Sequence, residues 1–141
     1  MHVMPPHLDT LIRRLQATSI AYQTRLAERI IKLSTAFAED YEGHTLSAQS
    51  LAGLVDFLEA SAASGYPDLT ATPAGDVYAE WHGPEGRRLT IEFLASGDAR
   101  YLLFRPNPKH PQRVDRLTGT TIIDALPETV APLALLTGLA A

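Results

Sequence analysis

Glu80 and His82 stand two residues apart, and Glu92 lies on the next predicted strand. Residues two apart on a β-strand point to the same face, so a carboxylate and an imidazole would lie side by side there. Such a pair could serve general acid–base catalysis or metal binding. Because the solvated face of a sheet also requires alternating polar residues, we interpret the three residues as a polar sheet face, with no catalytic residue and no metal site.

A second group of candidate residues is basic. Four cations occur between residues 105 and 116, namely Arg105, Lys109, Arg113 and Arg116. They predict a basic loop that contacts phosphate groups or an acidic protein surface. No phenylalanine, tyrosine or tryptophan is interleaved with them to stack on bases, which disfavours nucleic acid as the partner.

Other chemical signatures are missing from the sequence. The absence of cysteine excludes disulfides, thiolate nucleophiles and cysteine-ligated zinc or iron–sulfur clusters. The stretches PAGD and GPEG lack the glycine spacing and the trailing Lys-Ser/Thr of a phosphate-binding loop. No serine occupies a Gly-x-Ser-x-Gly elbow. We therefore expect no cofactor.

Size and charge favour one small domain. The chain has 141 residues, of which 45% are hydrophobic, as is typical of a domain with a buried core. A formal net charge of -4 argues against a surface that binds nucleic acid all over. No apolar run reaches the roughly 18 residues of a membrane span, and residues 1–10 lack the pattern of a signal peptide. These features predict a soluble, cytoplasmic protein that does not contact a membrane.

The first predicted secondary structure lies within residues 8–41. Their apolar side chains recur at steps of three and four, which predicts an amphipathic helix. Thr18 or Ser19 could cap a second helix, so the pattern fits either one helix or two. An unbroken helix would be about 50 Å long at about 1.5 Å per residue, which is longer than a small domain can cover. Self-association through residues 22–41 is therefore one expectation.

Another helix is predicted after Gly43, with Ser47 as its N-cap and Gly65 beyond its end. Its expected buried residues are Leu51, Leu54, Val55 and Leu58. Short runs rich in β-branched and aromatic residues follow, and they predict strands at 76–82, 88–95 and 99–105, with a short fourth strand near 69–72. The turns GPEGR and SGD have hairpin length, so we expect antiparallel pairing.

Alternation along these strands separates two faces. The predicted core face consists of Val77, Ala79, Trp81, Leu89, Ile91 and Phe93. The predicted open face consists of Tyr78, Glu80, His82, Thr90 and Glu92. If Trp81 lies in the core, its indole nitrogen needs an acceptor such as a backbone carbonyl at the sheet margin.

The predicted fold is a single α+β domain. N-terminal amphipathic helices in residues 1–64 pack on an antiparallel meander of three to four strands in residues 65–106. Prolines and polar residues predict a loop at 107–121. A short C-terminal helix lies within 122–141, from about residue 123 to 137, with Pro127 in its first turn and a kink at Pro132.

The stretches LSAQSLAGLVDFLEA and YPDLTATPAGDVYAEWHGPEGRRLTIEFLASGD also carry a resemblance. They resemble a group of small bacterial proteins in which a helix precedes a Pro-x-x-Gly turn and a strand ending Glu-Trp-His is answered by a strand reading Leu-x-Ile-Glu-Phe. The resemblance covers about a third of the chain. It implies a fold and a bacterial setting but no reaction, and short proteins of this kind look like members of two-gene modules.

Together, these patterns favour a non-catalytic protein-binding module, as the antitoxin, immunity or adaptor member of a bacterial gene pair. Its partner would be another protein, such as a cognate toxin, or a second copy of the chain. The predicted partner-binding residues are Tyr78, Glu80, His82, Glu92, Arg105, Lys109, Arg113 and Arg116. Two alternatives stay open: a small enzyme or metal-dependent hydrolase that uses Glu80, His82 and Glu92, and a nucleic-acid binder that uses the basic loop.

Overall fold

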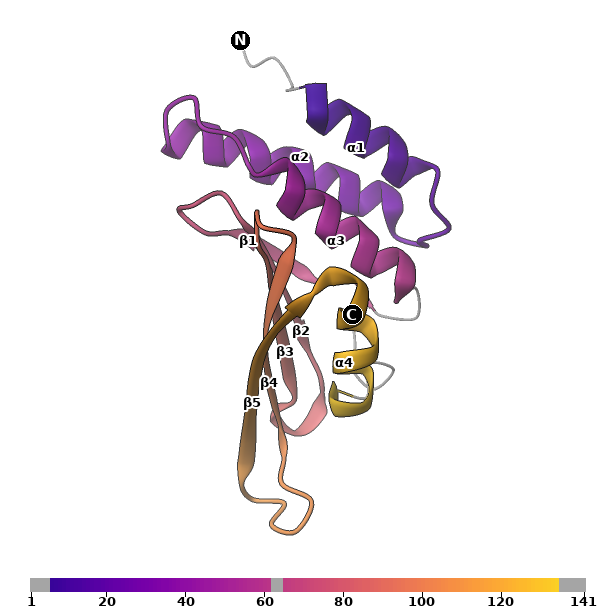
Figure 1. The fold of residues 1–141 in the computed structure, drawn as a ribbon, viewed down its shortest axis with the longest axis vertical. Helices are drawn as coiled ribbons and strands as arrows, with labels where there is room; N and C mark the ends of the chain where they lie inside the picture. Colours follow the sequence, from indigo (N-terminus) through magenta and orange to yellow (C-terminus); the bar gives the residue numbers. More distant parts are fainter. Residues whose placement is uncertain (1–5, 62–64, 135–141) are drawn as a thin grey trace.

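A computed structural model describes residues 6–61 and 65–134 of the chain (Figure 1). The elements are α1 (Pro6–Gln16), α2 (Gln23–Asp40), α3 (Ala48–Ala60), β1 (Asp68–Ala71), β2 (Val77–His82), β3 (Arg88–Phe93), β4 (Asp98–Pro106), β5 (Val114–Ile122) and α4 (Leu126–Ala134). Short 3-10 turns occur at Pro84–Gly86 and Ile123–Ala125. The strands form one antiparallel sheet in the order β1-β2-β3-β4-β5. The α+β meander is therefore confirmed, with five described strands rather than three to four.

The helices form a layer at one end of the sheet, and α4 flanks it (Figure 1). Helix α3 packs on β2 and β3, α2 packs on β1, and α4 packs on β4 and α3. The hairpin of β4 and β5 extends beyond the layer of α1, α2 and α3 (Figure 1). One face of the sheet is consequently covered along much of its length, while the other lies away from the helices.

The amphipathic stretch at residues 8–41 forms two helices. The Thr18 hydroxyl donates to the Leu15 carbonyl at 2.7 Å and accepts from the Ile20 N–H at 3.4 Å. It therefore provides hydrogen-bond partners for a backbone carbonyl and a backbone N–H at the C-terminal end of α1. Tyr22, at the N-cap of α2, makes no side-chain capping bond. Because α1 and α2 fold back on each other, the excess helix length that suggested self-association through residues 22–41 is not present.

Helix α3 follows its predicted pattern. Ser47 is the N-cap, and its hydroxyl accepts from the Ser50 N–H at 3.2 Å. The four apolar residues expected on its inner face are all buried: Leu51, Leu54, Val55 and Leu58. The capping residue and the periodic stripe thus fixed both the start and the rotation of this helix.

Trp81 is a core residue, as alternation predicted, with only 1% of its surface exposed. Its ring meets Phe57 of α3 edge-on, with centroids 5.7 Å apart. The indole N–H donates to the Gly65 carbonyl at 2.8 Å, which is the expected backbone acceptor at the sheet margin. The predicted core face is confirmed in full, because its pairs are Val77 with Phe93, Ala79 with Ile91, and Trp81 with Leu89, all of them buried.

The predicted loop at 107–121 is wrong. Residues 114–122 form β5, which pairs along its whole length with β4, and only residues 107–113 make the connecting turn. The Asn107 carboxamide oxygen accepts from the N–H groups of Lys109 and His110 at 2.8 and 2.9 Å. Its amide nitrogen donates to Asp115 at 3.0 Å. The prolines and polar residues therefore build a hairpin turn, and the β-branched residues after it form a strand.

Two smaller expectations are also modified. The turn between β1 and β2 reads Pro73-Ala74-Gly75, one residue shorter between proline and glycine than the pattern of the resembling group. Gly75 has a φ of 90°, and its carbonyl accepts from the Ser47 N–H at 2.8 Å, which ties this turn to the start of α3.

The C-terminal helix begins at Leu126, after a 3-10 turn, and residues 135–137 of the expected helix lie outside the described residues.

Candidate protein-binding face

Strand pairing aligns side chains into rows across the open face, which is the face turned away from α3. The rows are His82, Arg88, Phe104 and Arg116; then Glu80, Thr90, Leu102 and Thr118; then Tyr78, Glu92, Arg100 and Thr120. Residues directly opposite in an antiparallel pair lie on the same face with short Cβ separations. The open face therefore places charged, hydroxyl and apolar groups next to one another on adjacent strands.

Glu80 is the centre of a polar network on this face. Its carboxylate lies 3.0 Å from His82 Nε2 and 3.6 Å from Arg88 Nε. The Thr90 hydroxyl donates to the same carboxylate at 3.4 Å. The predicted contact between Glu80 and His82 is present, and three neighbours share this one carboxylate.

Glu92 is not part of that network. It is paired across the strands with Tyr78 and Arg100, and its carboxylate lies 3.5 Å from Arg100 Nη1. Glu80, His82 and Glu92 therefore lie on one face but do not converge on a common point. Among the residues that the structure describes, no group of three histidine, aspartate or glutamate side chains could hold a metal ion.

An apolar strip runs along β4 on the open face, toward the turn between β4 and β5. It consists of Leu102, Phe104 and Pro106 on β4 together with Val114 on β5, which pairs directly with Pro106. Val114 is 53% exposed and the other three are half-buried. The Arg88 guanidinium lies over the Phe104 ring, 4.7 Å from its centroid. Beside Phe104 and Val114 is a hollow of about 310 Å³, which Arg87 and His82 also line.

The basic residues at 105–116 are dispersed. Arg116 lies on the open face opposite Phe104, whereas Arg105 alternates with Phe104 and points to the helix side, opposite Asp115. Lys109 and Arg113 are in the hairpin turn, where both are exposed. The structure therefore brings Tyr78, Glu80, His82, Glu92 and Arg116 to one face and separates the other three predicted residues from it.

Two groups with shifted pKa values lie on the helices instead. Arg14 of α1 contacts Asp56 at 2.5 Å and Glu59 at 2.8 Å on α3. Burial lowers the pKa of its guanidinium, but these two hydrogen-bonded carboxylates outweigh burial and raise that pKa overall. Burial, with a smaller effect of Tyr66, raises the pKa of Tyr22 to about 12. Both shifts reflect packing between helices and loops, away from the open face.

Comparison of the sequence with models of known families, with curated proteins and with solved structures found no match. The resemblance noted from the sequence therefore stays a prediction. None of the helices within residues 6–61 and 65–134 combines the length and apolar character needed to cross a membrane.

Proposed function

We propose that this chain is a non-catalytic protein-binding module whose partner docks on the open sheet face over the apolar strip. One observation carries the proposal. The solvated face of an antiparallel sheet is ordinarily polar, but here Leu102, Phe104 and Val114 lie on it, and Val114 is 53% exposed.

The surroundings of the strip have the composition of an interface. Protein interfaces place apolar and aromatic side chains at the centre, enrich arginine, and surround the centre with a polar rim. Phe104 supplies the aromatic group, and Arg88 and Arg116 flank it in the same row. These cations favour a partner that presents carboxylates around an apolar group, since such a pairing is complementary in charge.

The polar network beside the strip supports binding rather than chemistry. The Glu80 carboxylate is shared by His82, Arg88 and Thr90, so it is held in place as a rim acceptor. The role of antitoxin, immunity or adaptor protein in a bacterial gene pair belongs to the same proposal, and it rests on the sequence resemblance alone.

The test compares two exposed apolar residues. Tagged wild-type chain, Val114→Asp and Tyr41→Asp would be used to capture proteins from lysate of the source organism, with mass spectrometry and a parallel assay for nucleic acid. Val114 is 53% exposed on the strip, and Tyr41 is 41% exposed at the end of α2. Circular dichroism would establish that both variants fold.

We expect one stoichiometric protein that wild type and Tyr41→Asp retain and Val114→Asp loses. Recovery of the chain alone, recovery of nucleic acid, or equal capture by both variants would contradict the proposal. Light scattering on the purified chain shows whether the chain binds a second copy of itself or requires a different protein as its partner. A dimer that Val114→Asp disrupts would assign the strip to self-association and overturn the heterologous partner.

A further inference from the structure

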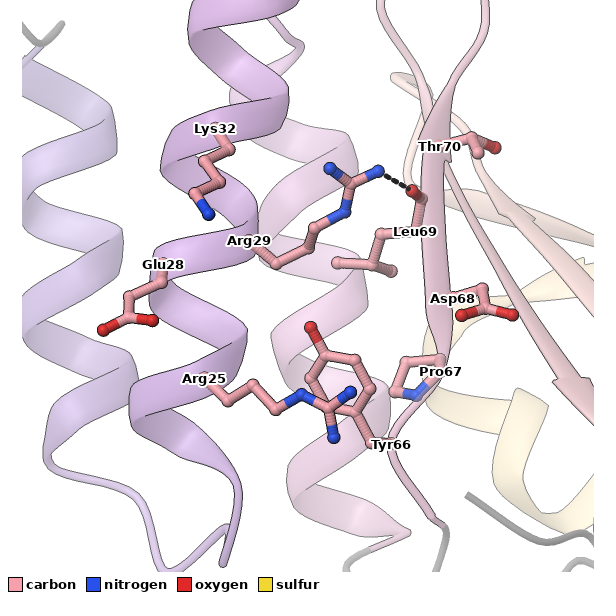
Figure 2. Close-up of a pocket in the computed structure, with 9 residues that line it drawn as sticks. All are labelled: Arg25, Glu28, Arg29, Lys32, Tyr66, Pro67, Asp68, Leu69 and Thr70. Carbon is pink, nitrogen blue, oxygen red and sulfur yellow. Dashed lines mark hydrogen bonds between the residues drawn. The ribbon is translucent and has the colours of Figure 1, made fainter.

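A second surface lies at the opposite edge of the sheet, between α2 and the edge strand β1. A groove of about 520 Å³ separates these two elements (Figure 2). Arg25, Arg29 and Lys32 of α2 line it on one side, and Tyr66 lines it at one end. The apolar strip is on β4 and β5, so this groove is independent of the proposed protein-binding surface.

Helix geometry explains why three cations share the groove. Arg25, Arg29 and Lys32 are separated by four and then three residues, which places them on one face of α2. The adjacent face carries Leu26 and Ile30, both buried in the core, and this burial fixes the rotation of the helix. At about 1.5 Å per residue the three cations extend over about 10 Å of the helix axis.

Three cations line the groove against two carboxylates, Glu28 and Asp68. Within the described residues, no ion pair joins any of these three cations to a carboxylate. Glu28 and Asp68 line the groove without pairing to these cations, and in Figure 2 the Asp68 carboxylate is turned to the far side of β1. Like charges on one helix face repel one another, and an anion bound between them would offset that repulsion.

Two of the cations are held in position. The Arg25 guanidinium lies over the Tyr66 ring, 3.9 Å from its centroid, and Tyr22 meets the same ring edge-on at 5.4 Å. Arg29 Nη2 donates to the Leu69 carbonyl of β1 at 2.7 Å (Figure 2). Each guanidinium has five N–H donors, so these contacts orient the groups and leave most donors for a ligand. Such pre-positioning reduces the entropy that a ligand must overcome.

We propose that the groove binds a small phosphorylated ligand with more than one negative charge, of the diphosphate class. Arg25 and Arg29 present planar donors that match two phosphate oxygens, and Lys32 supplies a third, compact charge. The span of the three cations exceeds a single phosphate group and suits two linked ones. The volume of about 520 Å³ falls within the usual range of small-molecule sites.

Titration calorimetry of the full chain with inorganic pyrophosphate tests this site. We expect saturable binding that weakens as salt increases. Lys32→Gln should raise the dissociation constant about tenfold, since it removes one charged hydrogen-bond donor to the ligand. Lys109→Gln is the matched control, because it removes the same charge from an exposed residue of the hairpin turn.

Arg25→Gln serves as a second groove variant, with the circular dichroism spectrum as the check of folding. Sedimentation with vesicles of phosphatidylcholine and phosphatidic acid distinguishes a lipid headgroup from a soluble ligand. Retention on vesicles that Lys32→Gln abolishes would assign a headgroup phosphate, and pyrophosphate binding without sedimentation would assign a soluble one. Absence of pyrophosphate binding, or equal weakening by Lys32→Gln and Lys109→Gln, would overturn the proposal. Neither the calorimetry nor the vesicle sedimentation depends on capture of a protein partner by the open face.

Discussion

The hydroxyl of Ser50 accepts a hydrogen bond from the backbone N–H of Val77 at 2.7 Å. The same hydroxyl donates to the carbonyl of Phe93, the residue that pairs with Val77 across β2 and β3. Ser50 is fully buried, with 0% of its surface exposed. One side chain of α3 therefore attaches the helix layer to the end of two central strands.

Ser50→Ala should destabilise the protein by about 2 kcal/mol, because it leaves a buried N–H and a buried carbonyl without their shared partner. The free energy of unfolding would be measured by urea denaturation, followed through the fluorescence of Trp81. Ser19→Ala is a suitable control, since Ser19 is exposed in the turn between α1 and α2. Equal stability of the two variants would show that the Ser50 bonds contribute little.

Gly119 of β5 is required by its cross-strand neighbour Tyr101. A Cβ atom at position 119 would lie 2.5 Å from Tyr101 Oη and 2.7 Å from Cζ, well inside van der Waals contact. We expect Gly119→Ala to cost about 2 kcal/mol, because the tyrosine ring must leave its place above the strand. In a Tyr101→Leu background most of that cost should disappear. A double-mutant cycle from urea denaturation measures the coupling, and additive effects would contradict this steric explanation.

Local patterns determined which parts of the fold could be predicted. Ser47 and the apolar stripe that follows it defined α3, and two-residue alternation placed Trp81 in the core and Glu80 on the open face. These features depend on residues close in sequence. The break between α1 and α2 lies near Thr18 and Ser19, but neither caps the second helix, because its N-cap is Tyr22.

Strand β5 was missed because its signal is weak. Prolines and polar residues precede it, and its β-branched residues are interrupted by Gly119, where a Cβ atom would meet Tyr101. The apolar strip was not predicted either, since Val114 lies beside the apolar residues of β4 only when β5 pairs with β4. The three cations of the α2 groove were visible as a helical pattern, but their proximity to β1 depends on tertiary packing.

The contact between His82 and Glu80 should contribute little to stability. The His82 side chain is 57% exposed, and its partner Glu80 retains contacts with Arg88 and Thr90 when the imidazole is removed. Exposed ion pairs are worth about 1 kcal/mol or less, so His82→Ala should change the free energy of unfolding by about 0.5 kcal/mol at most. A loss several times larger in urea denaturation would mean that His82 supports the sheet instead of lying free at its surface.

Tyr22 offers a prediction about pH. Its hydroxyl oxygen is buried and has no hydrogen-bond partner among the described residues. Because burial is the main cause that raises the pKa of Tyr22 from 10.0 to about 12, the folded protein holds this proton more tightly than the unfolded chain. The resulting stabilisation is complete below pH 10.0 and is lost as the pH rises toward 12.

Tyr22→Phe removes both the titrating group and the buried hydroxyl. At neutral pH the variant should be as stable as wild type or slightly more stable, because an unsatisfied polar atom disappears. Between pH 10.0 and 12 its stability should fall less steeply than that of wild type. Urea denaturation across this range measures both effects, with Tyr41→Phe as the control for an exposed tyrosine. Parallel pH profiles for wild type and Tyr22→Phe would show that the Tyr22 proton is not coupled to folding.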